Sequence, residues 1–439
     1  MLRILFCVLG GLFAAPVLAQ DSAFTVEQLS SLALQNSRLV RAAGLEAEKS
    51  EQEISATSAL RYPQFHVTGL ASKLMEPLDF TFKTGTLGNI GGVPFPATDT
   101  AVNAAGTSVN GLFIGTAIMP LSQQYKISLA VSARSLGADI ARQKYRQARC
   151  DIKSSVEKLA FGILEARKAL EASKIAEEGC ASGVADAERY SAERVVLPSE
   201  FLKAKAALAK QQYESEKLEH TITELSEQLN RLTGRPLDAP VEIALPELAQ
   251  SDPPPDLSEG AVARRADVSS ARYVAEQAAY DAKIKAAEYI PDLSVSVSDI
   301  RLSNTQYLPD NIASAGLYLN WDVFDWGKRS HELNEKRQSR EQAEKLLAET
   351  MDTARTDLRA RYDRLDEARK LCEAAQLSAQ AADETLRVAR DKFDEHALLP
   401  RDYNAARAAD ALAQSEYIKA LGEYYQARTQ FAIASGEDI

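Results

Sequence analysis

The chain repeats itself at a fixed offset over most of its length. Pro198 opens a helical run that ends near Gly234, and Pro400 opens one that ends near Gly436. Both pairs are separated by the same offset, because 400 minus 198 and 436 minus 234 each give 202. The register also holds at four pairs in between: Phe201 with Tyr403, Ser215 with Tyr417, Ile222 with Tyr424, and Leu229 with Phe431. A tandem duplication therefore organises the fold, and one unit can be analysed and then doubled.

The first residues have the pattern of a secretory signal peptide. Arg3 precedes an apolar run over residues 4–12, and a stretch of small residues ends at Ala19. This order predicts a signal peptide over residues 1–19 that is removed on export. No later apolar run reaches the roughly 18 residues that a membrane helix needs, so we expect any membrane crossing to use strands.

Composition argues against two broad classes of function. The formal net charge is −11, which disfavours a nucleic-acid partner. The sequence contains no Ser-His-Asp arrangement and no glycine-rich phosphate loop, and its four histidines are not at metal-ligand spacing. The chain is therefore predicted to be no enzyme and to need no metal or cofactor.

Each repeat is predicted to begin with an Ala- and Glu-rich helix that a proline ends. The first runs over 31–62 before Pro63, and the second over 260–290 before Pro291. Proline cannot donate the next backbone hydrogen bond, so the helix stops there.

Strand patterns follow these prolines. In the second repeat Leu293 and Val295 alternate with serines, and the return strand alternates in the same way. The period of two predicts β-hairpins at about 63–121 and 291–324, each with one apolar face. In the first hairpin the Gly- and Pro-rich residues 85–106 predict a long exposed loop.

Each repeat then becomes helical for about 70 residues, which at 1.5 Å per residue is about 105 Å. Apolar residues recur at spacings of three and four along these stretches, which predicts coiled-coil seams. We expect two long helical hairpins, at about 123–233 and 328–435. The predicted organisation is a signal peptide over 1–19, a first repeat over 20–240, a proline-rich linker over 241–256 and a second repeat over 257–439.

Four strands with an apolar face cannot form a complete membrane structure in one chain. In lipid, an open sheet leaves its edge groups unpaired at a cost of several kcal/mol each. Three chains supply twelve strands, enough for an open barrel, whereas two chains supply only the eight of a filled one. The sequence therefore predicts a mainly α homotrimer. Its 12-stranded β-barrel contacts membrane lipid and continues into a long α-helical barrel.

Several short sequence segments of the chain resemble those of the TolC-like outer membrane efflux proteins. They are Arg-Ala-Asp-Val at 265–268, Ile-Pro-Asp-Leu at 290–293 and Trp-Asp-Val-Phe-Asp-Trp-Gly-Lys-Arg at 321–329. The resemblance covers the whole mature chain and includes the duplicated order of elements. It implies a trimeric channel in the cell outer membrane that extends into the periplasm. This channel is the passive exit duct of a tripartite efflux pump or type I secretion system, docked to a periplasmic adaptor and an inner-membrane RND or ABC transporter.

The turns of the long hairpins are the candidate docking site. In the family the equivalent turns form the periplasmic tip that meets the adaptor, and apolar tips need covering. The same residues are equally suited to closing the hairpins, and both interpretations stay open. The candidate adaptor contacts are Val195, Val196, Leu197, Pro198, Leu398, Leu399, Pro400 and Arg401.

Two acids next to these turns are candidates for the pore constriction. Asp402 aligns with an acid that lines the family's constriction, and Glu200 is its counterpart in the first repeat. Three copies around an axis form a ring that attracts cations. The family's second acidic ring falls on Ala405, and first-turn acids also stabilise a helix through its dipole. Asp410, which stands in a predicted seam where the first repeat has Leu208, is expected to face solvent.

One alternative from another class fits the long hairpins, namely a soluble periplasmic coiled-coil adaptor or scaffold. Such a protein needs no strands with an outward apolar face, so the two strand hairpins favour the channel. Trp321 and Trp326, near a strand end, are predicted to join an aromatic belt at the membrane interface or to pack in a core.

Overall fold

The computed structural model describes residues 23–76, 78–105, 109–193, 197–248, 256–303 and 309–437, apart from the side chains of 103–105 and Pro400. The chain divides into two compact units. The helical unit contains residues 1–38, 149–255 and 361–431, and the strand unit contains 39–148, 256–360 and 432–439. Each unit takes residues from both sequence repeats, so the compact units do not coincide with the repeats.

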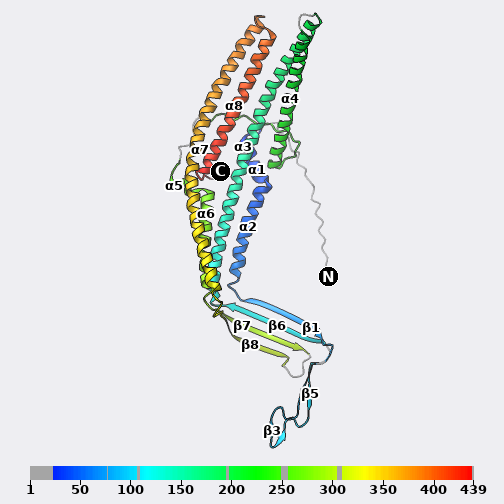
Figure 1. Ribbon diagram of the computed structural model, residues 1–439, viewed down its shortest axis with the longest axis vertical. Helices are drawn as coiled ribbons and strands as arrows, with labels where there is room; N and C mark the ends of the chain where they lie inside the picture. Colours follow the sequence, from blue (N-terminus) through cyan, green and yellow to red (C-terminus); the bar gives the residue numbers. More distant parts are fainter. Residues whose placement is uncertain are drawn as a thin grey trace, which may run out of the picture. The chain divides into compact units, whose positions relative to one another are not determined.

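The chain forms two long helical hairpins, whose residues belong partly to the helical unit and partly to the strand unit (Figure 1). Helix α3 (Gln123–Ala192) turns into α4 (Pro198–Thr233), and α7 (Lys328–Asp394) turns into α8 (Pro400–Ala434). The predicted coiled-coil seam is confirmed in α3, where Ile152, Val156, Ile163 and Ala166 are buried. None of the helices in the described residues is both long enough and apolar enough to span a membrane.

The ends of α4 follow from its sequence. Leu197 is extended and Pro198 occupies the first turn, where a missing N–H costs nothing. Gly234 ends the helix in the left-handed region with φ of 74°, which favours glycine. Helix α1 (Val26–Asn36) packs at this end, and the Asn36 side-chain amide donates to the Thr233 carbonyl at 2.9 Å.

The strand unit contains a four-stranded antiparallel sheet in the order β1-β6-β7-β8 (Figure 1). Its strands are β1 (Gln64–Lys73), β6 (Val109–Pro120), β7 (Asp292–Ser303) and β8 (Asn311–Asn320). The two hairpins are joined by the β6–β7 pair, which aligns Gly111 with Ser303 and Pro120 with Ser294. Within one chain β1 and β8 therefore remain at the two edges.

Each entry helix is broken into two, whereas the sequence analysis predicted one continuous helix. The first comprises α1 and α2 (Arg38–Ala59), and the second α5 (Glu259–Arg264) and α6 (Ala266–Ala287). Ser37 and Arg265 have extended ψ values of 122° and 141° at the breaks. The Arg265 guanidinium is held by the Asp267 and Asp357 carboxylates, each at 2.9 Å, and this pairing fixes the second break.

The loop predicted at 85–106 is exposed as expected, but about half of it lies in short strands that belong to a longer ribbon. Strand β2 (Leu78–Phe82) pairs with β5 (Thr100–Ala105), and β3 (Asn89–Ile90) pairs with β4 (Val93–Pro94). Gly91 and Gly92, with φ of 63° and 87°, make the tight turn between β3 and β4. We call residues 78–105 the ribbon. It continues beyond the ends of β1 and β6 (Figure 1), and residue 106 lies outside the described residues.

Candidate pore tip and strand exit

The turn between α3 and α4 presents one exposed leucine and one exposed acid. Leu197 is 69% exposed, and its carbonyl accepts the Glu200 N–H at 2.9 Å. The Glu200 carboxylate pairs with Lys203 Nζ at 2.8 Å, which raises the pKa of that lysine. Val195 and Val196 lie outside the described residues.

The turn between α7 and α8 is closed by aromatic stacking. His396 adopts φ of 60°, and the rings of Phe393 and Tyr403 stack at 4.7 Å between centroids. Leu399 is 60% exposed, whereas Leu398 is partly buried. Leu398 therefore contributes to closing the turn, and Leu399 is presented outward like Leu197.

The acid next to this turn is also at the surface. The Asp402 N–H donates to the Leu399 carbonyl at 3.0 Å, and Arg401 Nε approaches the Asp402 carboxylate at 3.2 Å. Both side chains are well exposed, so this pair is worth at most about 1 kcal/mol. No hydrogen bond or ion pair within the described part of the chain joins Asp402 to Glu200. Each carboxylate thus remains open to water or to another subunit.

Asp410 does not face solvent, so the expectation of a wet seam is wrong for the single chain. The residue is 7% exposed. Gln414 Nε2 donates to its Oδ2 at 2.8 Å, and its Oδ1 has no hydrogen-bond partner among the described residues. The next residue, Ala411, packs with Ala172 and Ile175 of α3, and these small side chains let α3 approach.

A second buried acid, Glu157 of α3, is not among the residues predicted from the sequence. Glu157 is 6% exposed, and the Thr429 hydroxyl of α8 donates to its Oε1 at 2.9 Å. Burial raises the pKa of Glu157 to about 7, against the lowering effects of Thr429, Lys153 and Arg428. The only sequence signal is its position directly after the seam residue Val156, since the hydroxyl partner comes from the other repeat.

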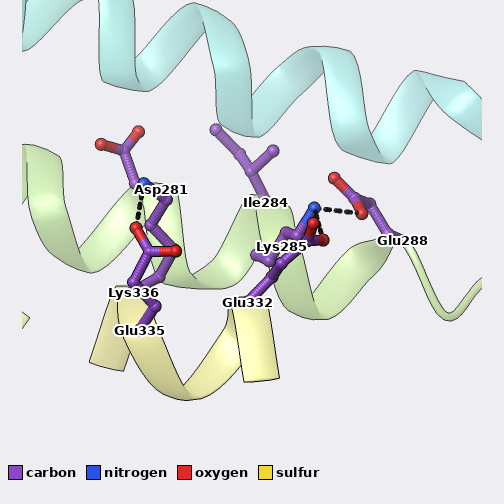
Figure 2. A pocket seen from close by; sticks show the side chains of 7 residues that line it. All are labelled: Asp281, Ile284, Lys285, Glu288, Glu332, Glu335 and Lys336. Carbon is purple, nitrogen blue, oxygen red and sulfur yellow. Dashed lines mark hydrogen bonds and ion pairs between the residues drawn. The ribbon is translucent and has the colours of Figure 1, made fainter. Parts of the chain in front are cut away.

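A charged cleft of about 480 Å³ lies between α6 and α7 where the sheet meets the helices (Figure 2). Lys285 Nζ binds Glu288 at 2.7 Å and Glu332 at 2.6 Å, and these bonds raise the pKa of the lysine. The cleft's central cation is thus used to hold the end of α6 against the start of α7. Among the described residues no group of three or more acid, histidine or cysteine side chains is placed to hold a metal ion.

The strand exit that follows β8 exposes aromatic side chains. Trp321 is 52% and Trp326 89% exposed, and the rings of Phe324 and Trp326 meet edge to face at 5.0 Å. Arg329 fixes the backbone beside them, with its Nε at 2.6 Å from the Asp325 carboxylate. In the single chain neither tryptophan packs in a core, which leaves the membrane interface as the prediction for both.

A family model describes nearly all of the chain. The model of the outer membrane efflux protein family matches residues 29–235 and 257–437. No curated protein matches the chain at a significant level.

Solved structures of bacterial outer-membrane channels share the fold. The Campylobacter jejuni outer membrane channel CmeC superposes with a TM-score of 0.74 at 17% identity, over 94% of this chain and 85% of that one. The Vibrio cholerae outer membrane protein VceC gives 0.68 at 16% identity, over 94% and 96%. The open state of the Neisseria gonorrhoeae channel MtrE gives 0.68 at 16% identity, over 94% and 89%. These matches confirm the TolC-like fold class.

Proposed function

Because the chain belongs to the outer membrane efflux protein family, we propose that three copies form the passive exit duct of a tripartite efflux pump or a type I secretion system. The family is one of channels and not of enzymes. The protein is located in the outer membrane and extends into the periplasm. The proposal adds the trimer, the docking partners and the roles of individual residues.

The two open edges of the four-stranded sheet carry the argument for three copies. Residues that are aligned across neighbouring strands form rows of the sheet. In the rows nearest the helices, one face of the sheet is mostly apolar. Its larger members are Phe65, Met119, Val295, Val297, Leu317 and Leu319. Placing that face in lipid requires every edge group to be paired, since each unpaired one costs several kcal/mol. Pairing β8 of one copy with β1 of the next meets this demand, and three copies close a ring wide enough to conduct.

The soluble adaptor is the weaker candidate. It leaves an apolar sheet face and two open strand edges without a partner. Fractionation separates the two: a trimer in detergent extracts of the outer membrane that dissociates on heating supports the duct. A monomer in the soluble periplasmic fraction supports the adaptor and refutes the duct.

We place docking of the periplasmic adaptor, and through it of an inner-membrane RND or ABC transporter, at the hairpin turns. Leu197 and Leu399 are exposed at equivalent places in the two repeats, and an apolar residue at a tip gains free energy when a partner covers it. Leu197→Asp and Leu399→Asp should abolish efflux and leave trimers in the membrane. The matched control is Leu377→Asp, at a residue 67% exposed in the body of α7. Unchanged drug sensitivity in the tip variants refutes this docking site.

We place the constriction at Asp402, with Glu200 as its counterpart. Both carboxylates are exposed in the single chain, so three copies can present them to one axis. A ring of carboxylates attracts cations and binds divalent ions. In planar bilayers Asp402→Ala should lower cation selectivity and weaken block by divalent cations, whereas Asp383→Ala in α7 should change neither. Identical selectivity and block in Asp402→Ala and wild type refute the ring.

A further inference from the structure

The face of the sheet that is polar near the helices becomes apolar further along the strands. On the face opposite the apolar one, the rows nearest the helices are mostly polar, with His66 aligned with Thr116, Thr116 with Ser298, and Ser298 with Ser314. The two rows that follow on this same face are almost entirely apolar. Their apolar members are Ile114, Ile300 and Ile312 in one row and Leu70, Leu112 and Leu302 in the next. We call these six residues the collar.

On the opposite, lipid-facing side, charged residues first appear at the level of the collar, next to the apolar Val67 and Phe113. Asp299 and Arg301 occupy this side beside the collar and pair at 3.1 Å. An ion pair on this face marks the point where the sheet leaves the hydrocarbon, because charges there cost several kcal/mol. The collar therefore lines the outer mouth of the duct and not its membrane-embedded part.

The ribbon has one apolar face of its own. Leu78, Phe80 and Phe82 alternate with Asp79 and Thr81 along β2, so the three apolar side chains share a face. They are 50%, 53% and 38% exposed, respectively. An isolated two-stranded ribbon is at best marginally stable in water, and this one exposes the residues that would hold a third layer. Its apolar face therefore needs a partner surface.

The collar offers a place of the right size for such side chains. A pocket of about 140 Å³ opens at its far end, where Leu70, Leu112 and Leu302 line it together with Leu74. The polar residues Ser72, Asn110 and Ser303 and the small Gly111 complete its lining. An apolar cavity of about 150 Å³ is enough to hold a benzene ring. Phe80 and Phe82 carry rings of this size, and in the single chain neither is buried.

Charge argues against the membrane surface as the partner of the ribbon. Between residues 74 and 105 the charged side chains are Glu76, Asp79 and Asp99 against Lys83. Segments that bind anionic lipid headgroups are clusters of Lys and Arg. A segment with more acids than bases is not drawn to such headgroups, which leaves another protein surface to cover the phenylalanines.

We propose that the apolar face of the ribbon docks against the collar of a neighbouring copy, so that three ribbons together cover the outer mouth. The ribbon continues from β1, the strand that meets the next copy in the proposed trimer, and so it starts at the boundary between copies. The inference rests on the trimeric duct proposed above. It adds an interaction surface that narrows the duct at the end opposite to the hairpin turns.

Disulfide trapping tests the contact directly in the full-length protein. In a background with the native cysteines at 150, 180 and 372 replaced by alanine, Phe80→Cys is combined with Leu302→Cys. Oxidation in the membrane should convert the protein to covalent dimers and trimers on a denaturing gel without reductant. The matched control pairs Thr81→Cys, on the other face of the same strand, with Leu302→Cys, and should stay monomeric.

The outcomes separate this inference from the duct itself. If unheated wild type runs as a trimer but the Phe80 pair gives no covalent oligomer, or both pairs give equal amounts, docking between copies is wrong and the duct stands. Alternatively, a probe attached to the cysteine of Phe80→Cys reports a lipid environment while the Phe80 pair gives no cross-link. This result assigns the ribbon to the membrane surface and also overturns the inference. If wild type is monomeric, the duct proposal fails first and the docking fails with it.

Conductance tests the consequence of docking at the mouth. The mouth and the constriction proposed at Asp402 conduct in series, so the mouth is tested in an Asp402→Ala background. In this background Phe80→Asp and Phe82→Asp should raise single-channel conductance and make cells more sensitive to large polar antibiotics. Thr81→Asp, which changes the ribbon's charge on its other face, should leave both near the level of the Asp402→Ala parent. Equal conductance in all three variants and this parent shows that the ribbons do not narrow the mouth.

Discussion

Replacing Glu157 by glutamine should make the helical unit more stable at alkaline pH and leave it nearly unchanged at pH 5. The carboxyl is 6% exposed, and its Oε2 has no hydrogen-bond partner among the described residues. Ionising it in this position is therefore costly. Glutamine has nearly the same volume, carries no charge, and keeps an oxygen that accepts the Thr429 hydroxyl at 2.9 Å.

The magnitude follows from the raised pKa. Burial moves the pKa of Glu157 from 4.5 to about 7. Between these pH values the folded protein holds a proton that the unfolded chain has released, so the free energy of unfolding falls as pH rises. At about 1.4 kcal/mol per pKa unit the loss is about 3 kcal/mol, absent below pH 4.5 and complete above pH 7. Glutamine removes this loss.

The assay is thermal unfolding followed by helix circular dichroism in detergent, at pH values from 5 to 8. Wild type should melt at lower temperature as pH rises, and the melting temperature of Glu157→Gln should exceed it by an amount that grows with pH. Glu171→Gln, at an exposed acid on the same helix, should follow the wild type throughout. A difference between Glu157→Gln and wild type that is constant across this range refutes a titrating buried carboxyl.

Two further substitutions test the packing and the helix break. A Cβ on Gly422 would lie 2.8 Å from Cβ of Phe161, so Gly422→Val should destabilise the protein by roughly 1–3 kcal/mol in thermal melts, whereas Gly183→Val, at an open site, should be nearly neutral. Arg265→Gln removes the guanidinium that joins Asp267 of α6 to Asp357 of α7 and should lower stability by roughly 1–3 kcal/mol. Wild-type melting temperatures in Gly422→Val or Arg265→Gln would contradict the corresponding contact.

Local periodicity was enough to predict the long helices and the paired strands. A repeat of three and four residues needs only neighbouring turns of one helix, and strand alternation needs only one strand. The breaks at Ser37 and Arg265 were missed because they depend on distant contacts. Arg265 is held by Asp357, 92 residues away in sequence. The ribbon was also missed, because β2 alternates over only five residues and stands between Pro77 and the glycines at 85 and 88.

In the candidate site, too, local sequence predicted only the features that do not depend on distant contacts. Leu197 and Leu399 were predicted at the turns from the Leu-Pro pairs, which act through local backbone geometry. The buried acid Glu157 was not, since its hydroxyl donor Thr429 lies 272 residues further along the chain. Burial of Asp410 likewise depends on how closely α8 approaches α3, which no spacing along one helix specifies.

Pairing of β6 with β7 has a consequence for the order in which the exported chain folds. Gly111 and Ser303 are 192 residues apart in sequence, yet they face each other in the middle of the sheet. The first repeat must therefore emerge into the periplasm with β6 lacking its later neighbour until β7, near the start of the second repeat, has also been translocated. Contacts of such long sequence separation form slowly, and unpaired edges aggregate in the meantime. We therefore expect the yield of mature protein to depend on a periplasmic chaperone that shields β6 during this interval.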